Sequence, residues 1–303
     1  MTAARAEALT VAAPRRLPRP SFLGALGGEV LKLRRQGWIW AMLGVAVALF
    51  AVLSLAVLQV TLMRQTLQSS PSVFVYNLYD IYLNVFDTGA GIFLLIVSAR
   101  LVGMEYSGGT IRVLLGRGAG RLRLFLAKLT ALALLGLGLL GGYLVLVGAT
   151  VYLSVLGWGS AGHLATVPSH VWGDLVPSLM VSLASIGVAI LIGSTASVVG
   201  RSVTFGLTAA LAFFPADNAL TLLSSFLSNL THQGVWKALT TFLLGPSLNV
   251  LPQVMETDRR AHVAFAVPLS PVSTLHAWLV VAGWSAAMLA ACVLLLRRRD
   301  VLQ

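Results

Sequence analysis

The sequence predicts an all-helical, polytopic integral membrane protein with six transmembrane helices. Three observations lead to this fold class. Apolar residues make up 57% of the 303-residue chain and charged residues only 10%, whereas average soluble proteins carry about 25% charged residues. The mean hydropathy is +0.88. Several apolar runs are long enough to cross a bilayer as helices, and none of them alternates as a half-buried strand does.

This composition excludes a soluble enzyme, a disulfide-stabilised scaffold and a disordered chain. The one cysteine, Cys292, has no internal partner and lies within an apolar run, as a small buried hydrophobic residue does. Helices are the expected spanning structure because lipid offers no hydrogen bonds, so each segment must satisfy its own backbone.

Residues 1–37 are predicted to form a cytoplasmic basic arm followed by an interfacial helix. Ser21 is a candidate N-cap, and the residues after it recur at helical spacing. Apolar and polar side chains then fall on different faces, which is typical of a helix lying along the inner leaflet. The apolar face holds Phe22, Leu26, Val30 and Leu33, and the polar face holds Glu29, Lys32 and Gln36.

Residues 38–303 are predicted to form one transmembrane domain. A window of about 19 residues finds six spans, at residues 38–62, 83–102, 124–156, 171–199, 203–227 and 275–296. The last two are separated by an outer segment, residues 228–274. Its apolar run at residues 235–244 is too short to cross the bilayer, so a re-entrant segment is expected there.

The distribution of charge predicts the orientation. The chain has 21 Lys and Arg residues, and 17 of them are expected on one side of the membrane. These 17 lie before the first span, around the loop between spans two and three, in the turn between spans four and five, and at the end of the chain. Because basic loops stay in the cytoplasm, both termini are expected to be cytoplasmic. These residues are spread along membrane flanks and do not form one aromatic-studded face, so nucleic-acid binding is not expected.

The loop at residues 104–124, between spans two and three, is the most informative stretch. Thr110 can cap a short helix, residues 111–115 give it about one and a half turns, and Gly116 can end it. A further helix begins near Arg121 and continues into span three. The result is a partly apolar knob outside the membrane that suits a partner protein. On composition alone, a simple turn whose arginines satisfy the positive-inside rule is equally open.

These residues resemble the permease subunits of type-2 ATP-binding-cassette (ABC) transporters, mostly bacterial exporters. That family repeats a glutamate after span two, a Gly-Thr pair, a short coupling helix, a turn with a basic residue, and a lysine that opens span three. The family commonly has proline in the turn, where this chain has Gly118 and Ala119. The matching positions are Glu105, Gly109, Thr110, Ile111, Arg112, Val113, Leu114, Leu115, Arg121 and Lys128.

The resemblance implies that the loop seats in a groove of a separate ABC ATPase, present in two copies, with the interfacial helix beside it. It also implies a second permease copy, identical or related, in the lipid of a bacterial cytoplasmic (inner) membrane. The chain has no Gly-x-x-x-x-Gly-Lys-Ser/Thr motif, so ATP and Mg²⁺ are expected on the partner and no cofactor or metal on this chain. The expected function is export of an amphipathic or hydrophobic compound, and the chain itself is not an enzyme.

An ion- or proton-coupled secondary carrier or channel is the alternative. Such proteins keep ionisable groups deep in the bilayer, and Asp87 and Asp217 are the candidates here. Pro215 is expected to break span five, which makes Asp217 and Asn218 candidates for lining a pathway, while a helix cap beyond the kink is equally open. An intramembrane enzyme is a third class, but neither His-Glu-x-x-His nor Gly-x-Ser-x-Gly occurs.

Overall fold

The computed structural model describes residues 21–59, 61–108, 120–255 and 266–298, and every regular element within these ranges is helical. Six segments of the described chain are long and apolar enough to cross a membrane. The predicted fold class and number of spans are therefore confirmed. In chain order the segments are Gly37–Val57, Pro71–Ser107, Arg121–Gly157, Ser169–Gly200, Val203–Thr231 and Thr274–Arg298.

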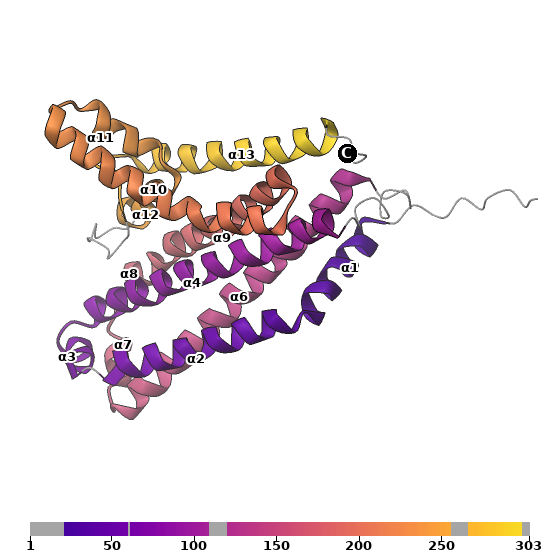
Figure 1. The fold of residues 1–303 in the computed structure, drawn as a ribbon. Coiled ribbons are helices and arrows are strands. Elements are labelled where there is room, and N and C mark those ends of the chain that lie inside the picture. The colour runs from indigo at the N-terminus through magenta and orange to yellow at the C-terminus, as the bar shows by residue number, and fades with distance from the viewer. Residues whose placement is uncertain (1–20, 60, 109–119, 256–265, 299–303) are drawn as a thin grey trace, which may run out of the picture.

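Six long helices and several shorter ones make up most of the described chain (Figure 1). The long helices are α2 (Gly37–Gln59), α4 (Pro71–Ser107), α6 (Arg121–Gly157), α9 (Leu175–Gly200), α10 (Val203–Thr231) and α13 (Thr274–Arg298). The shorter elements are α1 (Phe22–Arg35), α3 (Thr61–Ser69), α7 (Ala161–Leu164), α8 (Ser169–Gly173), α11 (Val235–Leu239), the 3₁₀ turn η1 (Thr240–Phe242) and α12 (Leu244–Met255).

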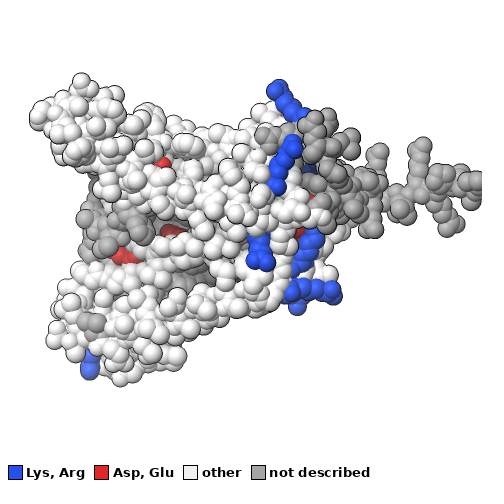
Figure 2. All heavy atoms as spheres, in the orientation of Figure 1, with Lys and Arg blue, Asp and Glu red and all other residues white. Residues whose placement is uncertain are grey.

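The molecule has two chemically different ends. At the basic end lie α1, the end of α4, the start of α6 and the end of α13, and at the far end lie α3, α7, α8 and α11 (Figure 1). Figure 2 shows most of the visible Lys and Arg atoms gathered at the basic end with a few Asp and Glu atoms among them, and further Asp and Glu atoms in the other half, some of them in a hollow. Lys and Arg side chains of the described residues therefore concentrate at one end.

The core of the bundle is the contact of α4 with α9 and α10. Gly193 of α9 lies against α4 so closely that a Cβ atom there would be 2.7 Å from the carbonyl oxygen of Leu95. Small residues at such contacts let helix backbones approach, and close packing is what holds helices together in lipid. This contact makes α4 the central helix of the described structure.

Helix α10 differs from its prediction, because it is continuous from Val203 to Thr231 with Pro215 inside it. The predicted break at Pro215 is wrong. A proline removes one backbone N–H from the helical ladder, but a spanning helix tolerates this where neighbouring groups satisfy the freed carbonyl. Here α4, α9 and α12 all pack against α10, and this packing favours one continuous helix.

The segment predicted as an outer re-entrant region begins with the last turn of α10 and continues as α11, η1 and α12. Helix α12 buries Leu244, Leu248 and Leu251 against its neighbours α9, α10 and α13. It is therefore an integral part of the bundle, and its depth in a bilayer stays a prediction.

Candidate functional site

Helix α1 brings a carboxylate to the basic end of the bundle. Its N-cap is Ser21, whose Oγ accepts the Gly24 N–H at 3.1 Å, as predicted. The helix packs on α6 with Leu33 and Glu29 buried. The prediction placed Glu29 on a polar face distinct from the apolar one, yet the residue as a whole is only 3% exposed. A buried carboxylate needs compensating partners.

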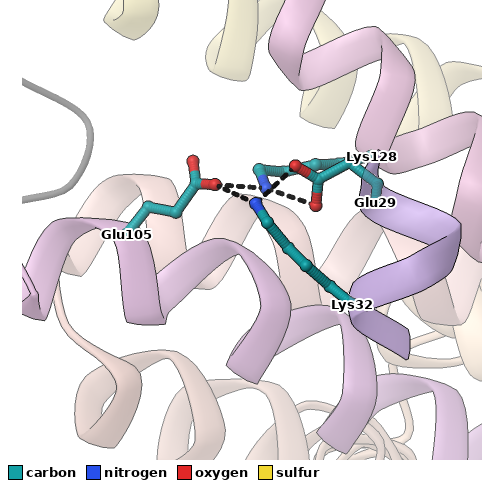
Figure 3. A network of polar contacts seen from close by, with 4 residues as sticks. All are labelled: Glu29, Lys32, Glu105 and Lys128. Atoms are coloured by element: carbon teal, nitrogen blue, oxygen red, sulfur yellow. Dashed lines mark hydrogen bonds and ion pairs between the residues drawn. The ribbon is translucent and has the colours of Figure 1, made fainter. Parts of the chain in front are cut away.

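Glu29 finds its partners in a network of four charged side chains (Figure 3). Lys128 of α6 contacts Glu29 at 2.8 Å and Glu105 of α4 at 2.6 Å. Lys32 of α1 contacts the same two carboxylates, at 2.7 Å and 3.1 Å respectively. Two carboxylates and two ammonium groups balance, so the network as a whole carries no net charge.

Exposure differs sharply across the network. The Lys128 side chain is 3% exposed and that of Glu29 4%, whereas that of Lys32 is 46% exposed. Burial works to lower the pKa of Lys32, but the hydrogen bond and charge of Glu29, with those of Glu105, outweigh it and hold the pKa above its ordinary value. Lys128 is thus the buried centre of the network and Lys32 its solvent-facing member.

The network joins the helices on both sides of the loop predicted to bind a partner. Glu105 lies in the last turn of α4, and Lys128 lies two turns into α6. The segment between these helices, residues 109–119, lies outside the described residues. Most of the predicted coupling residues fall within it, namely Gly109, Thr110, Ile111, Arg112, Val113, Leu114 and Leu115.

Two further cations tie helix ends together near the network. Arg121, at the start of α6, donates from Nη1 to the carbonyl oxygen of Leu296 in the last turn of α13, at 3.2 Å. A cation at a helix C-terminus complements the helix dipole. The guanidinium of Arg100 in α4 lies 4.8 Å from the ring centre of Trp38 in α2. Arg121 therefore has a role within this chain, and its predicted contact with an ATPase stays a prediction.

A cavity of about 400 Å³ lies among α4, α9, α10 and α12. This volume is in the range of small-molecule sites, roughly 300–1,000 Å³. Apolar walls include Leu83, Val181, Phe214 and Leu248, and the polar groups include Asp80, Asn84, Asp87, Ser178, Asn218 and Asn249. The cavity stands apart from the ion network, because its α4 residues run only from Tyr79 to Leu95.

The two predicted pathway residues have different surroundings. Asn218 lines the cavity. Asp217 is not among the lining residues, and its Oδ2 accepts the backbone N–H of Gly245 at 2.6 Å. That N–H lies in the first turn of α12, where intrahelical acceptors are missing. Asp217 thus caps a helix. The sequence left a helix cap beyond Pro215 open as an alternative to a pathway residue, but the capped helix is α12 and not a continuation of α10.

Sequence reasoning missed how Glu29 and Lys32 are used, and it missed the cavity residues other than Asp87 and Asn218. One local signal existed for Glu29, since it is the only acid in the otherwise basic stretch 21–36. Nothing local marked Asn84 and Asn249, because only packing brings α4 and α12 to one cavity.

The described residues define a polytopic helical membrane protein with a buried charge network at one end and a cavity toward the other. The family model for ABC-2 family transporter proteins matches residues 25–216. The match covers more than half of the chain, and the chain belongs to this family. A comparison with curated proteins finds no match.

Membership makes this chain a membrane permease, that is, a transport component and not itself a catalytic enzyme. The family as a whole works with an ABC ATPase partner. The matched range contains all four residues of the ion network and ends at Ala216, directly before Asp217.

Proposed function

We propose that this chain is the permease of an ATP-driven exporter and is coupled to a separate ATPase subunit through the loop at residues 104–124. The observation that carries the proposal is the ion network. It joins α1 to the helices on both sides of the loop, through four contacts of 2.6–3.1 Å. Displacement of the loop by a partner would therefore move α1, α4 and α6 together, as coupled rigid elements do.

The complete exporter would contain two such permeases, identical or related, and two ATPase subunits that hold ATP and Mg²⁺. It would lie in the cytoplasmic membrane of a bacterium with its basic end and both termini in the cytoplasm. The charge distribution supports this orientation, because Lys and Arg concentrate at that end (Figure 2). The cargo would be amphipathic or hydrophobic, which the largely apolar cavity walls support.

The first experiment tests the partner. The full-length permease is purified in mild detergent, and any bound subunit with a phosphate-binding motif is identified. The Leu114→Glu variant is expected to insert normally but to lose that subunit, because a charge replaces an apolar contact. The matched Leu114→Met variant should retain it. A permease that transports with no subunit bound would overturn the proposal.

The second experiment tests the coupling. In the reconstituted complex, Glu105→Ala is expected to leave the permease inserted while ATP hydrolysis no longer drives transport, because α4 loses its link to Lys128 and Lys32. Arg64→Ala is the control, since Arg64 lies in α3 at the far end. If ATP hydrolysis drives transport in Glu105→Ala as well as in the wild type, the ion network has no part in the coupling.

The third experiment tests orientation. Cys292 is replaced by serine, and single cysteines are placed by Arg64→Cys or Arg117→Cys. Only the first should react with an impermeant thiol reagent added outside intact cells. Reaction of the second alone would reverse the proposed topology.

A secondary carrier is the second candidate, and Asp87 is the observation that favours it. Its Oδ1 is shielded from solvent and has no hydrogen-bond partner among the described residues, as an ion- or proton-binding carboxylate would be. This candidate requires transport that needs an ion gradient and no ATPase. Transport that stops when ATP is removed and persists when gradients are collapsed would exclude it.

A further inference from the structure

The cavity wall contains a carboxylate, Asp87, with no basic side chain beside it among the described lining residues. Asp80 and Asp87 both line it from α4, and no Lys, Arg or His is among the described lining residues. Asp80 already has an interaction partner, so Asp87 is the carboxylate that a ligand could engage. Burying a carboxylate beside apolar side chains is unfavourable unless a cation or several donors compensate it. A bound molecule that carries a positive charge would therefore be stabilised in this cavity.

Asp87 is the lining carboxylate whose side chain has an oxygen without a hydrogen-bond partner among the described residues. This oxygen, Oδ1, is inaccessible to solvent. The other buried aspartates of the described bundle are engaged: Asp174 accepts the hydroxyl of Tyr76 at 2.5 Å, and Asp217 accepts the N–H of Gly245. Asp174 and Asp217 are thus engaged by neighbours, whereas Oδ1 of Asp87 is left without a hydrogen-bond partner among the described residues.

The size and lining of the cavity indicate an organic molecule in place of a metal ion. Ca²⁺ requires six to eight oxygen ligands at about 2.3–2.6 Å, whereas the described lining residues include only two carboxylates, Asp80 and Asp87. Within the described residues no group of three or more His, Cys, Asp or Glu side chains is placed to hold a metal. The walls contributed by Leu83, Val181 and Phe214 suit an apolar body attached to the charge.

We propose that this cavity binds a monovalent organic cation with an apolar body, and that Asp87 pairs with its positive charge. Asp80, which already has a partner of its own, lies on the same helix about two turns nearer the far end. The amide side chains of Asn84 and Asn218 supply donors and acceptors around the charge. The inference rests on the proposed function, because it specifies the chemical class of the exported compound.

The test uses a matched pair of probes on the full-length permease in nanodiscs. Tetraphenylphosphonium and tetraphenylborate have nearly the same shape and opposite charges. Binding of each is measured by equilibrium dialysis with radiolabelled probe, and binding to empty nanodiscs is subtracted to remove partition into lipid. The cation is expected to bind at least about tenfold more tightly than the anion, since one unscreened carboxylate favours one sign.

Variants then show which side chain causes the preference for the cation. Asp87→Asn keeps the size of the side chain and removes its charge, and it should reduce the preference for the cation to less than about threefold. Asp80→Asn should reduce it by less. Asp174→Asn is the control, because it makes the same change in a carboxylate already engaged by Tyr76, and it should leave the preference unchanged.

Equal binding of the two probes to the wild type, or no binding of either, overturns the inference. So does an Asp87→Asn variant that folds and keeps the wild-type preference. These outcomes are separate from failure of the proposed function, because binding to the permease alone needs neither ATPase nor transport. A cation preference in a permease that binds no ATPase would support this site and reject the exporter.

Discussion

The ion network and the cavity use the same kind of side chain in opposite ways. At the basic end, Glu29 and Glu105 are each held by two lysines within 3.1 Å. In the cavity, Asp87 retains an oxygen with no hydrogen-bond partner among the described residues. A carboxylate whose charge is balanced within the chain holds helices together, whereas one without such balance is suited to a ligand.

Both regions are connected through one continuous helix. Asp87 and Glu105 lie on α4, which runs unbroken from Pro71 to Ser107. Eighteen residues of helix separate them, a rise of about 27 Å at 1.5 Å per residue. Because α4 also packs closely on α9 and α10, a displacement at the network would be felt at the cavity wall. This arrangement gives the proposed coupling a physical route.

The largest effect is expected from removing the buried centre of the network. Lys128→Met leaves Glu29 and Glu105 with only Lys32, so the free energy of unfolding should fall by about 3–5 kcal/mol, as for other buried pairs that lose one partner. The midpoint of thermal unfolding in detergent measures this. The double variant Lys128→Met with Glu105→Gln restores charge balance and should recover part of the loss. A single variant as stable as the wild type would show that the network does not hold these helices.

A smaller effect is expected at the cap beside the cavity. Asp217→Ala removes the acceptor of the Gly245 N–H and should cost about 1–2 kcal/mol, a typical loss for an N-cap. Asp217→Asn retains an acceptor oxygen and should cost much less. Hydrogen exchange at the first amides of α12 reports on the cap directly. Equal protection in the alanine variant and the wild type would argue against this role.

A still smaller effect is expected at the solvent-facing member of the network. Lys32→Met should change stability by less than about 1 kcal/mol, because exposed ion pairs contribute little and this side chain is 46% exposed. The thermal midpoints of Lys32→Met and Lys128→Met, measured side by side, give the comparison. A larger loss for Lys32→Met would reverse the assignment of the two lysines.

The smallest effect is a dependence on alkaline pH. The folded-state pKa of Lys32 lies above its ordinary value of 10.5, so its stabilising contribution is complete below that value and is lost as the pH rises through the folded pKa. The difference in thermal midpoint between wild type and Lys32→Met should therefore stay constant from pH 6 to about pH 10 and shrink above it. A difference that changes near neutrality would assign the effect to another group.

Sequence reasoning predicted the site unevenly, and particular residues show why. Glu105 and Lys128 were found through a resemblance in the loop region, and the structure brings them to 2.6 Å. Glu29 was placed on the correct helix without its role, because periodicity gives the face of a helix but not the neighbour that covers it. A helix break was predicted at Pro215 from the local chemistry of proline alone. In the structure α10 is continuous across this residue and packs against neighbouring helices.

The sequence by itself determined that this is a six-span helical membrane protein with one strongly basic end, because apolar length and charge distribution are local properties that a bilayer reads segment by segment. Only the tertiary structure decided which charges neutralise one another and which are left facing a cavity. Those outcomes depend on contacts between residues as far apart as Glu29 and Lys128, or Asp217 and Gly245. Side-chain pairing across helices follows from packing geometry, which a linear pattern does not contain.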